Sequence, residues 1–304
     1  NTRSFGSDAA LVALLGAEYI RGIQEALCIA VGKHFPGHGD TNMDSHRTLP
    51  SIDFDLARLR SLELVPFIRA IAAGVEGIMS AHISFPRIIQ NDEPATISPF
   101  MLGDLLRKEL GFTGIVLTDD MEMKGITGAM DIGEGAVRAV EAGADIVLVS
   151  THGKSAASIQ KALLDAVQKG RITQARIDES VRRIIRLKLK YRIMRMAEGK
   201  VVPDGPIYDK KDLSLLKEAQ AVNRELSRKS ILYQGDPALV PFAASAVVIT
   251  VTTNPVMKKA LQKSRATVIP FFNEKAVKAI KSGSGQCLLF YHAEKDNAAA
   301  IKSA

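Results

Sequence analysis

Two kinds of apolar pattern alternate along the first two thirds of the chain. Short continuous apolar runs, typical of strands buried on both faces, lie at 28–31, 77–82, 114–119 and 145–149. Between and after them, apolar residues recur every three or four positions, which predicts helices at 8–26, 55–73, 99–110, 133–142, 154–169 and 174–194. This alternation predicts an α/β fold in which helical crossovers join parallel strands.

Polar residues gather where the predicted strands end. Lys33 and His34 follow the first strand, His82 ends the second, and Asp119 and Asp120 end or follow the third. Catalytic groups occupy this position in a TIM barrel, and ligands bind there in an open doubly wound sheet. No glycine-rich dinucleotide fingerprint follows these strands, which favours the barrel. The pattern contains four strand–helix units of the eight that a barrel needs, so we expect the C-terminal half of a TIM (β/α)8 barrel.

A stretch rich in glycine and proline separates this region from the rest of the chain. Residues 197–212 are predicted to form a linker. Beyond it we expect a helix at 213–229, strands at 231–233, 246–251, 266–269 and 287–291, and helices at 254–263 and 273–281. The predicted organisation is a partial TIM-barrel catalytic domain over 1–196 and part of an α/β sandwich domain over 213–304.

The composition and charge pattern argue against several classes of partner. The 304 residues are 46% hydrophobic and 24% charged, which is ordinary for a globular protein of two domains. The net charge of +7 comes largely from 161–200, where basic residues stand at helical spacing, as on a solvated helix face. No nucleic-acid motif or interleaved aromatic residues accompany them, so we expect no nucleic-acid partner. No run of 18 apolar residues occurs, so we expect no membrane span.

Cysteine content and the first residues add little. Cys28 and Cys287 are far apart and match no metal spacing, so we expect free, partly buried thiols and no disulfide framework. Residues 1–8 are polar, and no signal region is present in this chain. The compartment stays open between the bacterial cytoplasm and secretion, and the oligomeric state is not predicted.

The densest group of chemically active side chains is the segment 33–46, which we call the motif loop. It carries three of the six histidines, together with Asp40 and Asp44. These residue types are acceptable ligands of zinc or iron. However, His34 and His38 would face one side only in a helix, which the intervening proline and glycine oppose. A phosphate-binding nest is a further, weaker alternative, because no Gly-Lys-Ser/Thr follows.

The third interpretation of the motif loop is acid–base chemistry. In an extended segment residues two apart point the same way, so Asp44 can hydrogen-bond His46. The carboxylate would then fix the tautomer of the imidazole and raise its basicity, as in hydrolases. An Asp-x-His pair by itself is more often a structural contact.

Asp119 and Asp120 form the second candidate group. A carboxylate that ends a buried parallel strand faces the mouth of a barrel, where nucleophiles lie. The alternative is that one aspartate caps the next turn and the other pairs with a basic residue. Because neighbouring residues of a strand point to opposite faces, one aspartate is expected to serve structure and the other chemistry.

Together these segments resemble a known family. Residues 33–46, continuing to Leu49-Pro50, are similar to the signature of family-three glycoside hydrolases in their β-N-acetylglucosaminidase branch. The segment 118–121 resembles the nucleophile strand of that family, and 3–5 the segment before its first helix here. The resemblance covers about residues 1–195 well and the remainder loosely.

The resemblance implies a role for each matching residue. Asp119 corresponds to the nucleophile that forms a covalent glycosyl-enzyme, His46 to the proton donor and Asp44 to its partner. Arg3, Lys33 and His34 correspond to residues that bind the sugar. Asp120, His38 and Asp40 also match the motif, and we interpret them as support for the loop and the rim.

The implied activity is hydrolysis of terminal β-linked N-acetylglucosamine from cell-wall muropeptides or chitooligosaccharides, with retention and with no cofactor or metal. This is the chemistry of peptidoglycan recycling. A phosphorylase, a metal-dependent hydrolase and a non-catalytic sugar-binding remnant are the alternatives. Since four strand–helix units leave a barrel open, we expect this chain to be a fragment. Alone it should fold and turn over poorly, with an exposed apolar face.

Overall fold

The computed structural model describes residues 4–39, 49–89, 92–150 and 153–204. It also describes six helical residues between 218 and 225 and three strands further along the chain. The chain divides into two compact units, residues 1–209 and 210–304.

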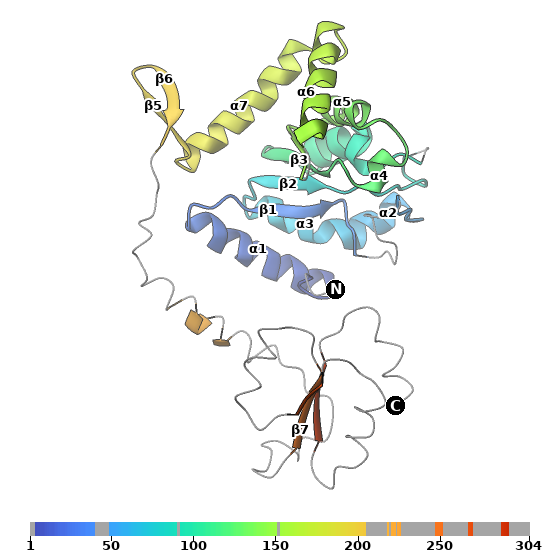
Figure 1. The fold of residues 1–304 in the computed structure, drawn as a ribbon, viewed down its shortest axis with the longest axis vertical. Coiled ribbons are helices and arrows are strands. Elements are labelled where there is room, and N and C mark those ends of the chain that lie inside the picture. The colour runs from blue at the N-terminus through green and yellow to red at the C-terminus, as the bar shows by residue number, and fades with distance from the viewer. Residues whose placement is uncertain are drawn as a thin grey trace. The chain divides into compact units, whose positions relative to one another are not determined.

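A four-stranded parallel sheet forms the centre of the first unit (Figure 1). Its strands pair in sequence order: β1 (Val31–Phe35), β2 (Gly77–Ser80), β3 (Ile115–Asp120) and β4 (Ile146–Leu148). The predicted α/β fold with parallel strands is therefore confirmed. Because the strands run the same way, their carboxyl ends meet at one edge of the sheet.

Helices lie before β1 and after each of these strands, and all but the short η2 and α4 lie close to predicted ranges. They are α1 (Ala9–Glu25), α2 (Leu56–Arg58), η1 (Leu59–Glu63), α3 (Leu64–Ala72), η2 (Ala95–Ile97), η3 (Phe100–Glu109), α4 (Lys124–Thr127), α5 (Ile132–Ala142), α6 (Gly153–Gln168) and α7 (Gln174–Lys190). Several start at a capping side chain: Asp8 accepts from the amide of Leu11 at 2.7 Å, and Asp131 from that of Gly133 at 2.8 Å. Such caps satisfy amides that have no partner inside the helix. None of the described helices is long and apolar enough to cross a membrane.

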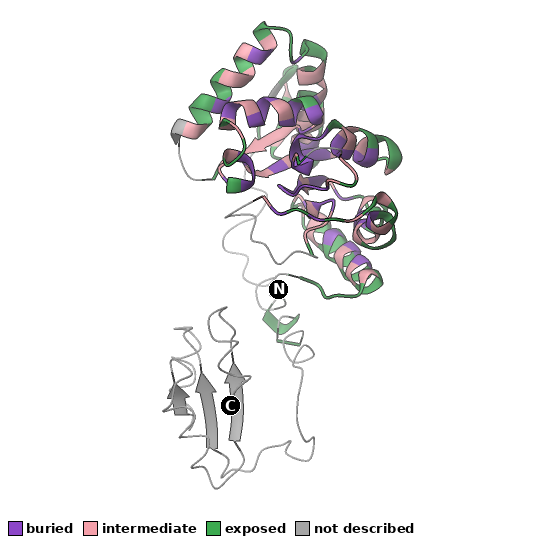
Figure 2. Ribbon diagram, turned by 90° about the vertical axis from the view of Figure 1, so that its right-hand side faces the viewer, coloured by how far each residue is buried: buried purple, intermediate pink, exposed green. Residues whose placement is uncertain are grey.

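The two faces of the sheet differ in burial. The paired residues Gly32, Ile78 and Val116 form one row across the strands, and Ile78 and Val116 are fully buried in the main apolar core. The neighbouring row, Lys33–Met79–Leu117, is exposed at Lys33 and only partly buried at the other two. The buried residues therefore concentrate between the sheet and its helices (Figure 2).

The first strand differs from its prediction. The sequence indicated 28–31, whereas β1 is Val31–Phe35, so Lys33 and His34 lie inside the strand. The apolar residue Ile29 packs beside Ile115, Leu187 and Tyr191 instead of pairing in the sheet. Cys28, expected to be partly buried, is exposed.

The structure at the start of the predicted linker also differs from the prediction. Residues 194–203 form a hairpin of β5 (Met194–Ala197) and β6 (Lys200–Pro203), and α7 ends at Lys190 instead of 194. Glu198 and Gly199 make its two-residue turn with φ of 50° and 75°. Both angles belong to the type of hairpin turn that favours glycine. The beginning of the stretch predicted as a linker therefore closes a hairpin.

The second unit contains β7 (Val247–Val251), β8 (Thr267–Ile269) and β9 (Cys287–Tyr291), all parallel in the order β8-β7-β9. These strands confirm the predictions at 246–251, 266–269 and 287–291. The predicted strand at 231–233 and the helices at 254–263 and 273–281 lie outside the described residues. The six described residues between 218 and 225 are helical, within the predicted helix at 213–229.

A buried carboxylate ties the amino ends of β3 and β4 to two helices. The side chain of Asp145, which immediately precedes β4, is 0% exposed. It accepts from the Val116 amide at 2.9 Å, from Arg107 at 2.7 Å and from Arg183 at 2.9 Å. Ser180 donates to it at 2.6 Å, and Arg176 lies 3.5 Å away. Asp145 thus contacts three guanidinium groups, two of which also lie near the half-exposed Glu179.

The second anchor at this end is Arg107 itself. It also donates to the carbonyls of Phe112 and Gly114, at 3.0 and 2.5 Å, in the turn before β3. Burial lowers the pKa of Arg107 to about 10, with the nearby Arg183 and Arg176 acting in the same direction and Asp145 opposing. The group remains a cation at neutral pH and needs its anion.

We predict that Asp145→Asn strongly destabilises the first unit. The substitution removes the buried counter-charge of Arg107, which Arg176 and Arg183 share, a loss of about 3–5 kcal/mol. Urea unfolding followed by far-ultraviolet circular dichroism measures it, since the chain has no tryptophan. Asp104→Asn is the matched control. It breaks an exposed pair with Lys108 and should cost less than about 1 kcal/mol. Equal losses in the two variants would contradict the prediction.

Candidate active site

Asp119 lies at the carboxyl end of β3 with its two carboxylate oxygens in different surroundings. Oδ1 accepts a hydrogen bond from the Asp120 amide at 2.8 Å. Oδ2 lies 3.6 Å from Nε2 of His34, at the corresponding end of β1. The two side chains are 18% and 20% exposed respectively. Asp119 is therefore held through one oxygen, while the other lies beside His34 in a partly exposed position.

The side chain of Asp120 makes hydrogen bonds that stabilise the fold. Its Oδ1 accepts from the Glu122 amide at 3.1 Å, and its Oδ2 accepts from the hydroxyl of Ser150. The next amide, of Met121, donates to the carbonyl of Leu148 in β4 at 3.0 Å. These bonds fasten the end of β3 to β4 and to the turn that follows. The two neighbouring aspartates therefore have different surroundings, as the alternation of a strand predicts.

The structure places some of the predicted site residues together. His34 lies beside Asp119, and the ring of His38 lies 5.5 Å from the ring of His34. Lys33 is exposed, on the strand that carries His34. Arg3, Asp44 and His46, with Asp40, lie outside the described residues. Of the predicted site, the described residues thus bring together His34 and Asp119, with His38 beside His34.

Gly37 fixes the beginning of the motif loop against η1. Its φ is 147°, a conformation that side chains rarely adopt. A Cβ at this position would lie 2.8 Å from the Cβ of Glu63. The Glu63 side chain is buried and bonds Arg58 at 3.1 Å. Only glycine lets the chain pass this close to the helix.

Three buried polar side chains lie behind Asp119 and Asp120, and no sequence pattern groups them. His82, which is 1% exposed, places Nε2 3.0 Å from the carbonyl oxygen of Asp120 and Nδ1 2.9 Å from the hydroxyl of Thr96. The same hydroxyl lies 2.9 Å from that of Ser80. We call Ser80, Thr96 and His82 the buried triad. The only signal in the sequence was a polar residue at the end of an apolar run.

The charge state of His82 follows from its surroundings. Burial lowers the pKa of His82 from its usual value, while the Asp120 carbonyl and the charges of Asp119 and Asp120 oppose the shift. The net direction favours the neutral imidazole. His82 therefore does not neutralise the Asp119 carboxylate.

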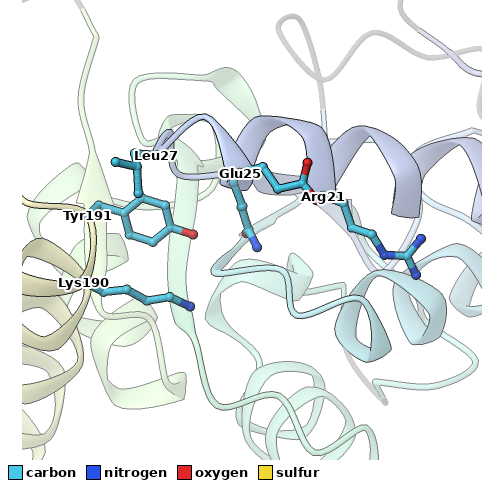
Figure 3. A pocket seen from close by; sticks show the side chains of 6 residues that line it. Arg21, Glu25, Leu27, Lys190 and Tyr191 are labelled. Atoms are coloured by element: carbon cyan, nitrogen blue, oxygen red, sulfur yellow. The ribbon is translucent and has the colours of Figure 1, made fainter. Parts of the chain in front are cut away.

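A hollow at the opposite end of the strands is a separate feature. It is lined by Arg21, Gln24, Glu25, Leu27, Lys190 and Tyr191 (Figure 3). Lys190 and the Tyr191 hydroxyl both contact Glu76, which precedes β2. Burial, followed by the charge of Glu76, raises the pKa of Tyr191 to about 12. Catalytic groups of parallel barrels lie at the carboxyl ends of the strands, so we do not assign this hollow to catalysis.

The geometry around Asp119 suits nucleophilic or acid–base chemistry. A partly exposed carboxylate with one fixed oxygen can attack an electrophilic carbon or hold a proton. Among the described residues, no three histidine, cysteine, aspartate or glutamate side chains are gathered in a way that could hold a metal ion.

Known proteins share both sequence and fold with this chain. A β-hexosaminidase A of Pseudoalteromonas piscicida is 34% identical over 207 residues, which cover 62% of this chain and 35% of the relative. A β-hexosaminidase of Idiomarina loihiensis is 35% identical over 198 residues, covering 65% and 56% respectively. The solved glycoside hydrolase family 3 β-N-acetylglucosaminidase of Paenibacillus sp. superposes with a TM-score of 0.82 at 35% identity, covering 99% of this chain and 61% of that one.

The matches to curated relatives thus span about a third to a half of those proteins. Residues 1–187, which include all four strands of the parallel sheet and the Asp119 site, match the Glycosyl hydrolase family 3 N terminal domain. On this match and on the shared parallel fold, the chain belongs to glycosyl hydrolase family 3.

Proposed function

We propose that this chain carries the catalytic site of a retaining β-N-acetylglucosaminidase, with Asp119 as its nucleophile. The observation that carries the proposal is the asymmetry of the Asp119 carboxylate. One oxygen is held by the Asp120 amide, and the other lies 3.6 Å from His34 Nε2, with both side chains partly exposed. The related β-hexosaminidases and the β-N-acetylglucosaminidase of Paenibacillus support this class of substrate. Terminal β-linked N-acetylglucosamine of muropeptides or chitooligosaccharides is the proposed group removed.

The proposed reaction has two steps. Asp119 Oδ2 attacks the anomeric carbon, and the bond to the leaving oxygen breaks as that oxygen takes a proton from His46. Water then attacks the glycosyl-enzyme, giving a proton back to His46 and releasing Asp119 and the sugar with retained configuration. Asp44 steers the imidazole through a hydrogen bond. Arg3, Lys33 and His34 are the proposed sugar-binding residues.

The histidine acid favours a second candidate reaction. Most retaining glycosidases use a second carboxylate where this proposal places His46. A neutral imidazole repels an anionic acceptor less than a carboxylate does, so phosphate could replace water in the second step. Product analysis distinguishes the two, because phosphorolysis yields a sugar 1-phosphate and requires added phosphate.

We also propose that the parallel sheet is the C-terminal half of a TIM barrel. The partly exposed row of Lys33, Met79 and Leu117 supports this, because such a row would face the interior once a barrel closed. The proposed domain limits remain 1–196 for the barrel part and 213–304 for the second domain, with 197–212 between them.

We predict that Asp119 is the residue labelled by a 5-fluoro glycosyl probe of N-acetylglucosamine. In the full-length protein, the adduct should map by mass spectrometry to the peptide that contains 117–123. Asp119→Ala should lower kcat/KM by about 10⁴-fold or more, because the covalent route is lost. Asp120→Asn should lower thermal stability, through its bonds to Glu122 and Ser150, and should cost far less in kcat/KM than Asp119→Ala. An adduct on Asp120 or Glu122 would reverse the assignment.

We predict that Asp44 and His46 act as one unit. Either single alanine variant should slow substrates with poor leaving groups far more than activated aryl glycosides, because only the former need protonation. The double variant should be little slower than the slower single variant. Steady-state rates across a series of leaving groups measure this, and fully additive losses would contradict a coupled pair.

We predict that a strong chelator leaves turnover unchanged. Both proposed steps use side chains alone. Dialysis against the chelator, with elemental analysis before and after, tests this directly. Stoichiometric zinc whose removal abolishes turnover, and whose return restores it, would instead favour a metal at His34, His38, Asp40, Asp44 or His46.

A further inference from the structure

The proton positions in the buried triad follow from the groups around His82. Nε2 faces the carbonyl oxygen of Asp120, which can only accept, so Nε2 must carry a proton. Thr96 has one hydroxyl proton, and two acceptors compete for it: His82 Nδ1 at 2.9 Å and the Ala81 carbonyl at 3.0 Å. If the proton goes to Ala81, Nδ1 must donate, and the ring is a cation. If it goes to Nδ1, the ring is neutral.

The neutral arrangement is the one that burial favours. His82, Thr96 and Ser80 are all essentially inaccessible to solvent, and a buried imidazolium carries a large desolvation cost. The hydroxyl of Ser80, 2.9 Å from Thr96, can donate to the oxygen whose own proton points to His82. The triad then forms a directed chain from Ser80 through Thr96 to His82 and ends at the backbone of Asp120.

The hydrogen bond from His82 to Asp120 is one of several that hold Asp120 in place. His82 holds the carbonyl of the Asp120–Met121 peptide, and the Leu148 carbonyl holds its amide at 3.0 Å. The Asp120 side chain is fixed by Ser150 and by the Glu122 amide. Because these bonds fix the backbone and the side chain of Asp120, its own amide is directed at Asp119 Oδ1, 2.8 Å away.

We propose that His82 is a positioning residue for the nucleophile, acting as the neutral Nε2–H tautomer set by Thr96. By holding the Asp120 backbone it keeps Oδ1 of Asp119 engaged and leaves Oδ2 aligned for attack. His82 is too deeply buried to meet a substrate, so its effect belongs to the rate of the chemical step and not to binding. This inference rests on the proposed role of Asp119.

A pair of amide substitutions separates this role from mere filling of space. Glutamine at 82 places its side-chain nitrogen near the position of Nε2, whereas asparagine carries the same group but reaches only near Nδ1. We expect His82→Gln to keep the hydrogen bond to the Asp120 carbonyl. We expect His82→Asn to lose it.

The measurement is the rate of covalent labelling by the 5-fluoro glycosyl probe in the full-length protein. His82→Asn should lower the maximal labelling rate by about 10- to 100-fold, the loss typical of a misplaced reacting group. His82→Gln should stay within about threefold of the unsubstituted protein, and the half-saturating probe concentration should change in neither variant. Equal rates for the two variants, or an effect on half-saturation alone, would overturn the proposal.

Two features keep the outcomes distinct. The labelled residue in the unsubstituted protein tests the role of Asp119 itself: an adduct elsewhere overturns both proposals. An adduct on Asp119 with equal variant rates overturns only the role of His82.

If the His82 variants do not fold, the pair Thr96→Val and Thr96→Ser tests the proposal instead. Valine removes the hydroxyl and should slow labelling several-fold, whereas serine retains it. Equal labelling by valine and serine variants would overturn the proposal.

Discussion

The position of β3 between β2 and β4 is the constraint on which the site depends. At its amino end, the Val116 amide bonds the buried Asp145 carboxylate, whose charge is compensated from η3 and α7. At its carboxyl end, Asp120 is bonded to Ser150, and the following amide to Leu148. Both ends of β3 are therefore held, so its register in the sheet is fixed. A slip by one residue would exchange the surroundings of Asp119 and Asp120.

The two ends of β3 are stabilised by different physical means. The amino end relies on charge compensation, in which the buried Asp145, together with Glu179, faces three partly buried guanidinium groups. The carboxyl end relies on hydrogen bonds from uncharged donors, namely His82, Ser150 and backbone amides. A neutral support is appropriate beside Asp119, because a fixed cation there would stabilise the carboxylate in its resting state and lower its nucleophilicity. The three partly buried guanidinium groups thus act at the end of the strand that lies away from Asp119.

Much of this arrangement could be predicted from the sequence, and the failures have local causes. The run ending in Asp119 is apolar and bounded by helical patterns, so its strand and the exit of its carboxylate were predictable. The start of β1 was not, because Ile29 is apolar for packing beside Tyr191 rather than for pairing. Glu198-Gly199 was read as part of a linker, since hairpin turns and linkers share the same residues. The contact of His82 with Thr96 joins β2 to η2, and no periodicity relates such positions.

The close contact between Gly37 and Glu63 has a consequence for how such a sequence can change over generations. Any side chain at 37 meets the β-carbon of Glu63, which rotation cannot move aside. Shortening Glu63 would in turn remove the carboxylate that Arg58 bonds. Neither position can drift by itself without loss, so the loop and its underlying helix are inherited as one block. Transplanting the loop into another scaffold would require carrying η1 with it.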